Sequence, residues 1–227
     1  MQIKEIENLP TESLFELANS IREENYRNIV TYSPKVFIPL TKLCLDRCGY
    51  CTFAEPPARL EFPYMDPEEV LKVARAGKQA GCHEALFTLG ERPELRYPTA
   101  EEWLTSRGYS STVDYLVAMS KLVLEETGLL PHANAGALYY EELLALKDVS
   151  ASQGMMLESI VPDLDCHRNS PDKTPERRIS TLKNAGELKI PFTTGILVGI
   201  GESRSSRIES LKVIAEIQRT YGHIQEV

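Results

Sequence analysis

Three closely spaced cysteines are the residues of this sequence best suited to chemistry. Cys44, Cys48 and Cys51 form a C-x3-C-x2-C pattern directly after the apolar run 36–40. Thiolates are preferred ligands of soft metal centres, and a 4Fe–4S cluster held by three of them leaves one iron free to bind another molecule. We therefore expect a 4Fe–4S cluster with one open iron on this loop.

Two other interpretations of these cysteines are open on spacing alone: a structural zinc loop, and buried thiols that bind nothing. Structural zinc normally takes four ligands in paired spacing, and no second Cys or His pair lies nearby in the sequence. The cluster is therefore favoured over zinc. We expect Cys82 and Cys166 to be ordinary core or loop cysteines rather than a fourth ligand.

Composition restricts the classes of partner. The 227 residues suffice for one full core, and 42% hydrophobic with 26% charged residues is ordinary for a globular protein. The net charge of −8 argues against a general nucleic-acid or anionic-membrane surface. Neither a membrane-spanning apolar run nor a signal-peptide core is visible, and five cysteines fit a reduced compartment, so we expect a cytoplasmic protein.

The elements that position the cysteines alternate between apolar β-rich runs and amphipathic helical stretches, which is typical of parallel β/α units. Strands are expected over 36–40, 84–89, 130–134, 154–158 and 191–198, and from 224 onward. Helices are expected over 66–80, around 116–128, from 174, over 203–221 and, before the first strand, over 11–25. The fold class is therefore α/β, with a TIM-like parallel β/α barrel.

We expect two regions, an N-terminal helical cap over 1–34 that covers the bottom of the barrel and a core over 35–227. The core contains about five and a half β/α units, so the sequence predicts a partial barrel truncated at its C-terminus and a fragment of a longer protein. Residues 92–112 form a long connection of the kind that is often functional.

In a parallel β/α barrel the functional residues gather at the C-terminal ends of the strands. Polar and glycine-containing segments follow the expected strands in order. They are the cysteine loop, Gly90-Glu91, Glu158, and the segment that contains Gly195, Leu197 and Gly199. A single Gly-Glu pair, strand-end glutamate or Gly-rich loop is weak evidence of function, but all four segments are expected at the same end of the barrel.

The cysteine loop, with Tyr50 before its last cysteine, resembles that of the radical S-adenosylmethionine (SAM) enzymes. The resemblance implies a 4Fe–4S cluster whose open iron binds the methionine end of SAM. It also implies that backbone carbonyls of Gly90-Glu91 hold the SAM amino group, that Glu158 binds the ribose, and that Arg178 pairs with the SAM carboxylate. Gly195, Leu197 and Gly199 would surround the adenine. Only one glycine of the family's Gly-Gly-Glu segment is present, Leu197 replaces isoleucine, and Arg177 could compete for the role of Arg178.

A finer resemblance is to the 7,8-didemethyl-8-hydroxy-5-deazariboflavin synthases. The similar segments are 36–41, 48–53, 130–134, 170–175 and 190–197, whereas Leu45, Asp46 and Ala135 depart from the family's pattern. The resemblance implies a lyase-type synthase of deazaflavin coenzyme biosynthesis. Its substrate is 5-amino-5-(4-hydroxybenzyl)-6-(D-ribitylimino)-5,6-dihydrouracil, from which a 5′-deoxyadenosyl radical abstracts hydrogen before cyclisation and loss of ammonia. The implied partners are a companion radical SAM enzyme that supplies this adduct and a low-potential electron donor.

Substrate contacts are expected from His132 and Asn134 at the end of strand three, from Asp172 and Lys173 after strand four, and from Thr193 and Thr194 in strand five. His132 could act as an acid or base because free imidazole titrates near pH 7. A strand-end histidine is more often structural, and Asp172-Lys173 could equally be a surface pair. Three functional alternatives stay open: the tyrosine-using partner enzyme, a biotin-synthase-like enzyme, and a truncated chain that only binds metal.

Overall fold

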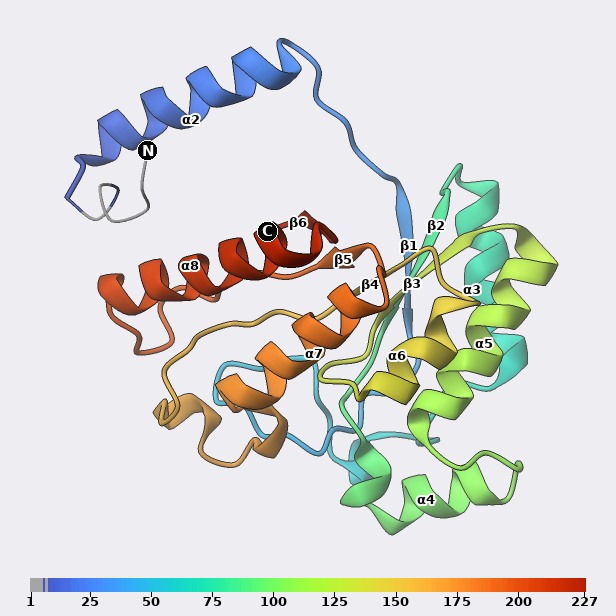
Figure 1. The fold of residues 1–227 in the computed structure, drawn as a ribbon. Helices are drawn as coiled ribbons and strands as arrows, with labels where there is room; N and C mark the ends of the chain where they lie inside the picture. Colours follow the sequence, from blue (N-terminus) through green and yellow to red (C-terminus); the bar gives the residue numbers. More distant parts are fainter. Residues whose placement is uncertain (1–5, 7) are drawn as a thin grey trace.

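The computed structural model describes residue 6 and residues 8–227, and its centre is one parallel sheet (Figure 1). The strands are β1 Lys35–Pro39, β2 Glu84–Thr88, β3 Leu130–Asn134, β4 Ser152–Gly154, β5 Phe192–Thr193 and β6 Ile224–Glu226. Their order in the sheet equals their order in the chain, and every neighbouring pair is parallel. The predicted partial β/α barrel is confirmed: its six parallel strands form one open sheet.

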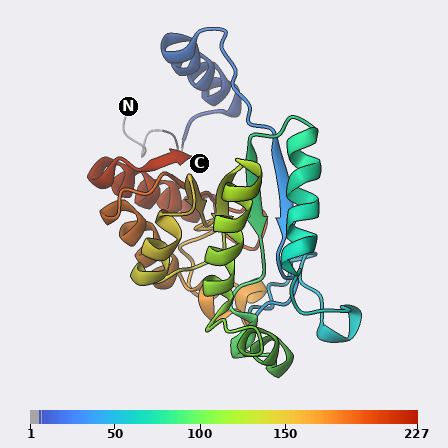
Figure 2. The same cartoon turned by 90° about the vertical axis from the view of Figure 1, so that its right-hand side faces the viewer.

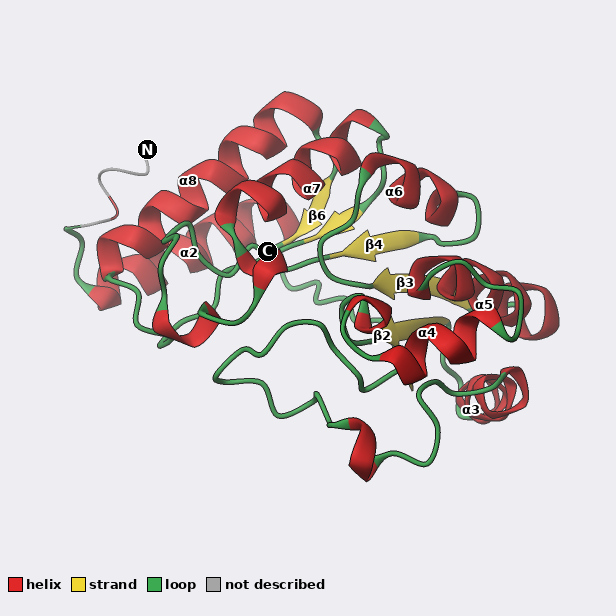
Figure 3. Cartoon of the chain, turned by 90° about the horizontal axis from the view of Figure 1, so that it is seen from below, coloured by secondary structure: helices red, strands yellow, loops and turns green. Residues whose placement is uncertain are grey.

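Helices cover one face of this sheet, as the view along it shows (Figure 3). They are α3 Pro67–Gln79, α5 Thr112–Thr127, α6 Tyr140–Lys147, α7 Pro175–Glu187 and α8 Arg204–Tyr221; α2 Thr11–Tyr26 precedes the sheet and α4 Pro98–Thr105 lies in a loop. Short 3-10 helices are η1 Pro57–Arg59, η2 Pro93–Leu95, η3 Asp165–His167 and η4 Pro171–Lys173. Because each crossover carries a helix, the loops at the C-terminal strand ends converge at one edge.

The core lies between the sheet and the helices. Ile38, Phe87 and Ala133 are in register on β1, β2 and β3 and are fully or almost fully buried there. Side chains alternate between the two faces of a strand, so the residues next to these point away from the helices. At one edge β1 packs closely on α3 (Figure 2), where Gly77 leaves room for the Val36 side chain.

The expected start of α3 is confirmed, including its capping box. An Asp66 carboxylate oxygen accepts a hydrogen bond from the Glu69 backbone N–H at 2.8 Å, and the Glu69 carboxylate accepts one from the Asp66 N–H at 2.8 Å. Gly128 ends α5 in the left-handed conformation, as its type predicts. These local signals fix where the crossovers begin and end.

The expected bounds of strands four and five were wrong. β4 ends at Gly154 rather than Glu158, and β5 covers two residues rather than 191–198. The ladder is interrupted because the Thr194 hydroxyl, not a backbone carbonyl, accepts the Leu157 N–H at 3.3 Å. Pairing resumes as one isolated parallel bridge between Glu158 and Ile196. The interruption turns the chain towards the candidate site.

Two helices were not expected from the sequence. Within the connection 92–112, α4 begins with Pro98 and buries Trp103 and Leu104. Between β3 and β4, α6 buries Leu143 and Leu146. Both helices are only eight residues long, which is too short for a clear 3.6-residue periodicity.

The expected N-terminal cap is only partly described, because residues 1–5 and 7 lie outside the described residues. α2 lies beyond the N-terminal ends of the strands in Figure 1, and none of its residues is buried. That α2 covers the barrel therefore stays a prediction. β1 and β6 form the two edges of the open sheet.

Candidate functional site

The three cysteines lie on the loop after β1, which backbone hydrogen bonds fix to two other loops. Leu45 N–H donates to the Glu91 carbonyl at 2.7 Å, which ties the loop to the segment after β2. Arg47 N–H donates to the Asn169 carbonyl at 3.1 Å, and Gly49 N–H to the Cys166 carbonyl at 2.8 Å. The cysteine loop is therefore held from both sides before any metal binds.

Each thiol has a different environment. Cys44 Sγ accepts a hydrogen bond from the Glu91 N–H at 3.2 Å, Cys48 Sγ lies 3.4 Å from the Ser170 hydroxyl, and Cys51 is exposed. Burial raises the pKa of Cys44 to about 12, against the effect of that hydrogen bond, and burial also raises the pKa of Cys48. Both are thiols without a metal, so cation binding must release their protons.

These donors fit the expected 4Fe–4S cluster. Three free cysteines share one loop, and N–H and O–H groups already reach two of the sulfurs, as outer-shell groups do around thiolate-bound clusters. In the described part of the chain, no three Cys, His, Asp or Glu side chains converge on a single ion, and this includes the three cysteines, so the cluster is favoured by the number and spacing of the thiols and not by their positions. Cys166 contacts the loop through its backbone and Cys82 packs against the core.

Gly90 and Glu91 bring the segment after β2 against the cysteine loop. A Cβ on Gly90 would lie 1.8 Å from the Leu43 carbonyl oxygen and 2.9 Å from Cys44 Cβ, so only glycine fits. The Glu91 carboxylate is buried, accepts the Ala137 N–H and lies 3.7 Å from Arg178. Burial raises its pKa to about 7 despite the attraction of Arg178. The sequence predicted only backbone contacts of Gly90-Glu91 with SAM, and not the close packing of Gly90 on the cysteine loop or the ion pair of Glu91 with Arg178.

Glu158 is the centre of a network of hydrogen bonds and ion pairs in the loop after β4. Its carboxylate accepts hydrogen bonds from the Tyr50 hydroxyl and, at 2.6 Å, from Lys173 Nζ. His167 Nε2 lies 3.0 Å and Arg178 3.6 Å from it. Burial alone would raise the pKa of Glu158, but Arg178 and Lys173 hold it below its usual value. Glu158 therefore carries a stabilised negative charge.

The backbone at Glu158 is left-handed, with φ of 65°. A residue with a Cβ adopts this conformation at a cost of roughly 1–2 kcal/mol. The neighbouring backbone compensates, because Glu158 N–H donates to the Gly195 carbonyl and the Glu158 carbonyl accepts the Leu197 N–H, each at 2.9 Å. The two segments that sequence reasoning assigned to ribose and adenine are therefore joined directly.

The two adjacent arginines face different groups. Arg178 is buried, donates to the Met156 carbonyl at 2.7 Å and lies between Glu91 and Glu158. Arg177 donates to the Ala137 carbonyl and stacks on Tyr139, with 3.7 Å from its guanidinium carbon to the ring centre. Of the two, only Arg178 reaches the network around Glu158.

The expected substrate residues do not form one group. The Asp172 carboxylate lies 3.4 Å from Arg92 and 3.6 Å from Arg177, whereas neighbouring Lys173 reaches Glu158. They are thus not a surface pair of each other. Asn134 ends β3, and Thr194 caps the interrupted ladder instead of facing the site.

His132 lies inside β3, and its Nδ1 is 2.7 Å from the Ser152 hydroxyl. Burial, and secondarily Lys35, lower its pKa to about 4, so the imidazole is neutral near pH 7. The expectation that it titrates near pH 7 was therefore wrong, because desolvation disfavours the imidazolium.

Sequence reasoning missed one residue, His167, and gave no role to the side chain of another, Glu202. His167 was not singled out, because only the tertiary fold brings it to Tyr50 and Glu158. Glu202 follows Gly199, which has φ of 91°, and its carboxylate accepts the Gly199 and Ile200 N–H groups at 2.9 and 2.8 Å. The glycine-containing segment is thus closed by its own acidic residue.

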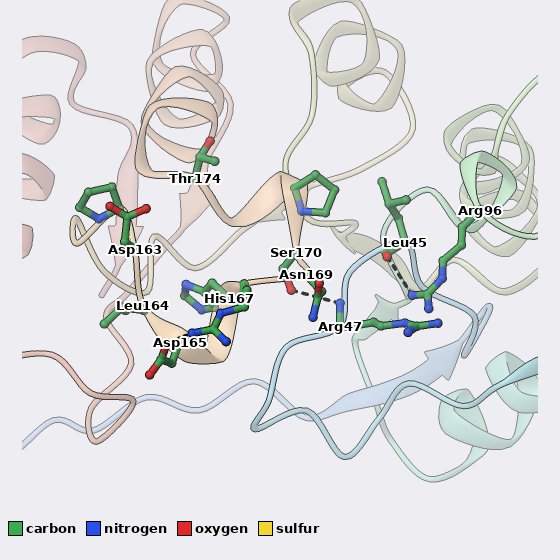
Figure 4. Close-up of a pocket in the computed structure, with 13 residues that line it drawn as sticks. Leu45, Arg47, Arg96, Asp163, Leu164, Asp165, His167, Asn169, Ser170 and Thr174 are labelled. Atoms are coloured by element: carbon green, nitrogen blue, oxygen red, sulfur yellow. Dashed lines mark hydrogen bonds and ion pairs between the residues drawn. The ribbon is translucent and has the colours of Figure 1, made fainter.

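A cavity of about 740 Å³ opens beside the cysteine loop (Figure 4). It is lined by Leu45, Arg47, Arg96, Pro162, Asp163, Leu164, Asp165, His167, Arg168, Asn169, Ser170, Pro171 and Thr174. Arg96 donates to the Leu45 carbonyl at 3.0 Å, which fixes one wall, and His167 links the opposite wall to Glu158. The cavity adjoins the site from outside, and Glu158 and Arg178 are not among its lining residues.

The comparison with protein families decides the classification. The model described as the radical SAM superfamily matches residues 38–214, which include the cysteine loop, Glu158 and Gly195. The chain belongs to the radical SAM superfamily. The predicted cofactors, a 4Fe–4S cluster and SAM, are those of radical SAM enzymes, so both predictions are confirmed.

Curated relatives narrow this similarity. The radical SAM chain is 53% identical over 207 residues to the FO synthase of Nocardia farcinica, covering 87% of this chain and 24% of the relative. It is 50% identical over 204 residues to the 7,8-didemethyl-8-hydroxy-5-deazariboflavin synthase of Methanopyrus kandleri, covering 88% and 61%. It is 54% identical over 199 residues to the synthase of the same name from Archaeoglobus fulgidus, and the match covers 88% of this chain and 59% of the relative. The chain therefore spans less than two thirds of these relatives.

Solved structures agree on the radical SAM fold. Methylornithine synthase (PylB) superposes with a TM-score of 0.70 at 21% identity, covering 95% of this chain and 60% of that one. The hydrogenase maturase HydG of Carboxydothermus hydrogenoformans superposes with a TM-score of 0.72 at 22% identity, covering 93% of this chain and 46% of that one. At such identities the likeness concerns the fold alone. Within the described residues, no helix has the length and apolar character needed to cross a membrane.

Proposed function

We propose that this chain carries the radical SAM chemistry of deazaflavin coenzyme biosynthesis. The substrate would be 5-amino-5-(4-hydroxybenzyl)-6-(D-ribitylimino)-5,6-dihydrouracil, and the product 7,8-didemethyl-8-hydroxy-5-deazariboflavin, with loss of ammonia. The observation that carries the proposal is the three-cysteine loop bonded to Gly90-Glu91 beside the Glu158 network, in a chain 50% to 54% identical to synthases of this product.

The cluster would be held by Cys44, Cys48 and Cys51, and with bound SAM it supplies the radical that abstracts hydrogen from the substrate. The Glu91 N–H that reaches Cys44 Sγ would remain as a hydrogen bond to the thiolate. Such a bond stabilises negative charge on sulfur and orients the ligand. The protein's task at this loop is thus to keep one sulfur ordered.

Glu158 and Arg178 would bind the polar ends of SAM. Glu158 carries negative charge and suits two ribose hydroxyls as donors, while buried Arg178 supplies a guanidinium for a carboxylate. Tyr50, Lys173 and His167 use three of the roughly four lone-pair positions of the Glu158 carboxylate, so binding of two hydroxyls requires exchange with at least one of them. Lys173 is the donor with a flexible side chain that can turn to the ligand.

The residues around this network also limit the access of water. Arg178 is 3% exposed and Glu158 is 7% exposed, so both charges act in a desolvated setting. A radical intermediate needs such exclusion, because stray hydrogen donors would quench it. A companion enzyme that supplies the adduct and a low-potential electron donor complete the proposal.

The test is anaerobic reconstitution of the chain with iron and sulfide, followed by reduction and incubation with SAM and the adduct. Formation of the deazaflavin together with 5′-deoxyadenosine is expected. Cys44→Ala, Cys48→Ala and Cys51→Ala should each abolish both products, whereas Cys82→Ala and Cys166→Ala should retain them.

Three outcomes would contradict the proposal. SAM cleavage with free tyrosine but not with the adduct would indicate the tyrosine-using partner enzyme. Sulfur insertion chemistry would indicate a biotin-synthase-like enzyme. Binding of zinc in place of an iron cluster would indicate a chain that only holds metal.

A further inference from the structure

The face of the sheet opposite the helices carries a line of polar side chains that the site described above does not use. Phe87, Ala133 and Phe192 are buried on the helix side, so the next residues, Thr88, Asn134 and Thr193, point the other way. We call these three residues the polar row. Thr88 is paired with Asn134, and Thr193 is paired with Gly154 on the strand between them.

The orientation of this face is supported by two contacts. A Cβ on Gly154 would lie 2.9 Å from His132 Nε2, so Gly154 and His132 share the open face. The Gln153 amide instead donates to the Leu143 carbonyl of α6 at 3.1 Å, on the helix face. With neighbouring strands about 4.8 Å apart, the polar row extends roughly 14 Å across β2 to β5.

The polar row has unused hydrogen-bonding capacity. Thr194 and His132 each have a protein partner, the Leu157 N–H and the Ser152 hydroxyl. No hydrogen bond between described residues engages the side chains of Thr88, Asn134 or Thr193, and all three are partly exposed. Together they offer two hydroxyls and one amide, each of which can donate and accept.

The surroundings of the polar row are neutral and include one exposed aromatic ring. Lys35 and Glu84 share this face, but they lie at the N-terminal end of the strands and neutralise each other at 3.0 Å. Among the residues in register with the row, the charged one is Glu226, exposed on edge strand β6. Phe37 lies on the adjacent strand β1, in register with Leu86, which precedes Thr88 by two residues on the same face. Its side chain is 63% exposed.

We propose that the polar row and Phe37 form the binding surface for a neutral ligand that joins an aromatic ring to a polyol chain. Phe37 stacks on the ring, and Thr88, Asn134 and Thr193 bind the hydroxyls. A charged ligand would lack a counter-ion here, and a purely apolar one would leave three polar side chains without partners. The inference rests on the proposed function and assigns its substrate to specific residues.

The position of the row agrees with this role. Gly154 and Thr193 precede Glu158 and Gly195 by four and two residues on the same strands or their continuations. A ligand on the row therefore lies beside the segments proposed to hold SAM.

The test measures binding to the reconstituted chain by calorimetry with two probes. One is 7,8-didemethyl-8-hydroxy-5-deazariboflavin, and the other is the same ring system with methyl in place of the ribityl chain. Thr88→Val, Thr193→Val and Asn134→Ala should each weaken binding of the ribityl probe by roughly 2- to 10-fold, the value of one neutral hydrogen bond. They should leave the methyl probe unchanged, whereas Phe37→Ala should weaken both.

Thr220→Val is the matched control, because Thr220 is exposed on α8 and bonds only its own helix. Unchanged affinity of the row variants for the ribityl probe would overturn the inference while the proposed function stands. If the wild-type chain bound neither probe, both the proposed function and the inference that rests on it would be contradicted. A row variant whose Tm fell by more than about 3 °C would also contradict the inference, because it would reveal a structural partner.

Discussion

Substitution of Gly90 by alanine tests whether the segment after β2 positions the cysteine loop. The added Cβ would lie 1.8 Å from the Leu43 carbonyl oxygen and 2.6 Å from its carbonyl carbon, both backbone atoms that no rotamer can move. Restoring ordinary contact requires the two segments to separate by about 1.6 Å, and overpacking of this kind costs roughly 1–3 kcal/mol. The separation must also stretch the 3.2 Å hydrogen bond from Glu91 to Cys44 Sγ.

The expected result is a lower midpoint of urea unfolding and less iron and sulfide bound after anaerobic reconstitution. Gly49→Ala is the matched control on the same loop, because its Cβ would meet Cys166 only at 3.5 Å, an ordinary contact. It should bind iron like the wild type. Equal iron content and equal stability of Gly90→Ala and Gly49→Ala would refute the reasoning.

Three further predictions concern stability. Gly77→Ala should destabilise the chain by about 1–3 kcal/mol because its Cβ would lie 2.4 Å from Val36 Cβ. Added Val36→Gly removes that atom, so the double variant should lose less stability in urea unfolding than the sum of the two single losses; additive losses would contradict the prediction. The pKa of His132 is about 4 in the folded chain and 6.5 in the unfolded one, so the unfolded state binds more protons between these pH values. Lowering the pH from 6.5 towards 4 should therefore reduce the free energy of unfolding, by about 2 kcal/mol at pH 5. Unfolding curves of His132→Gln should lack this decrease. Arg92→Lys should cost roughly 1–2 kcal/mol because lysine cannot reproduce the two 2.7 Å hydrogen bonds to Glu142, whereas Arg75→Lys at an exposed pair should change little; equal effects would show that the geometry of the Arg92 pair is unimportant.

The parts of the fold that could be predicted are those with local signals. The capping box at Asp66, the left-handed Gly128 and the apolar runs of β1 to β3 are written in consecutive residues. β4 and β5 were mislocated because their ladder ends through a side chain, the Thr194 hydroxyl, which lies 37 residues from its partner Leu157. No local pattern encodes such a contact.

The candidate site shows the same division. The cysteines stand out by type and spacing, Gly90 and Glu158 were predicted from the resemblance to radical SAM enzymes, and the fold brings their segments together. His167 joins Tyr50 across 117 residues, and Asp172 turns to Arg92 rather than to a ligand, so neither relation has a sequence signature. The choice between Arg177 and Arg178 likewise depends on which face of α7 meets Glu158.

The lengths of the strand ladders imply an order of assembly. β1, β2 and β3 are joined by five residue pairs at each boundary, whereas β4, β5 and β6 are each joined by two. Since every strand pairs with its neighbour in the chain, the well-paired half can form as it leaves the ribosome. The half that carries Glu158 and Gly195 then docks on that template and is the first to open by local unfolding. A ligand bound to Glu158 would favour the folded state of this half and so reduce its local unfolding.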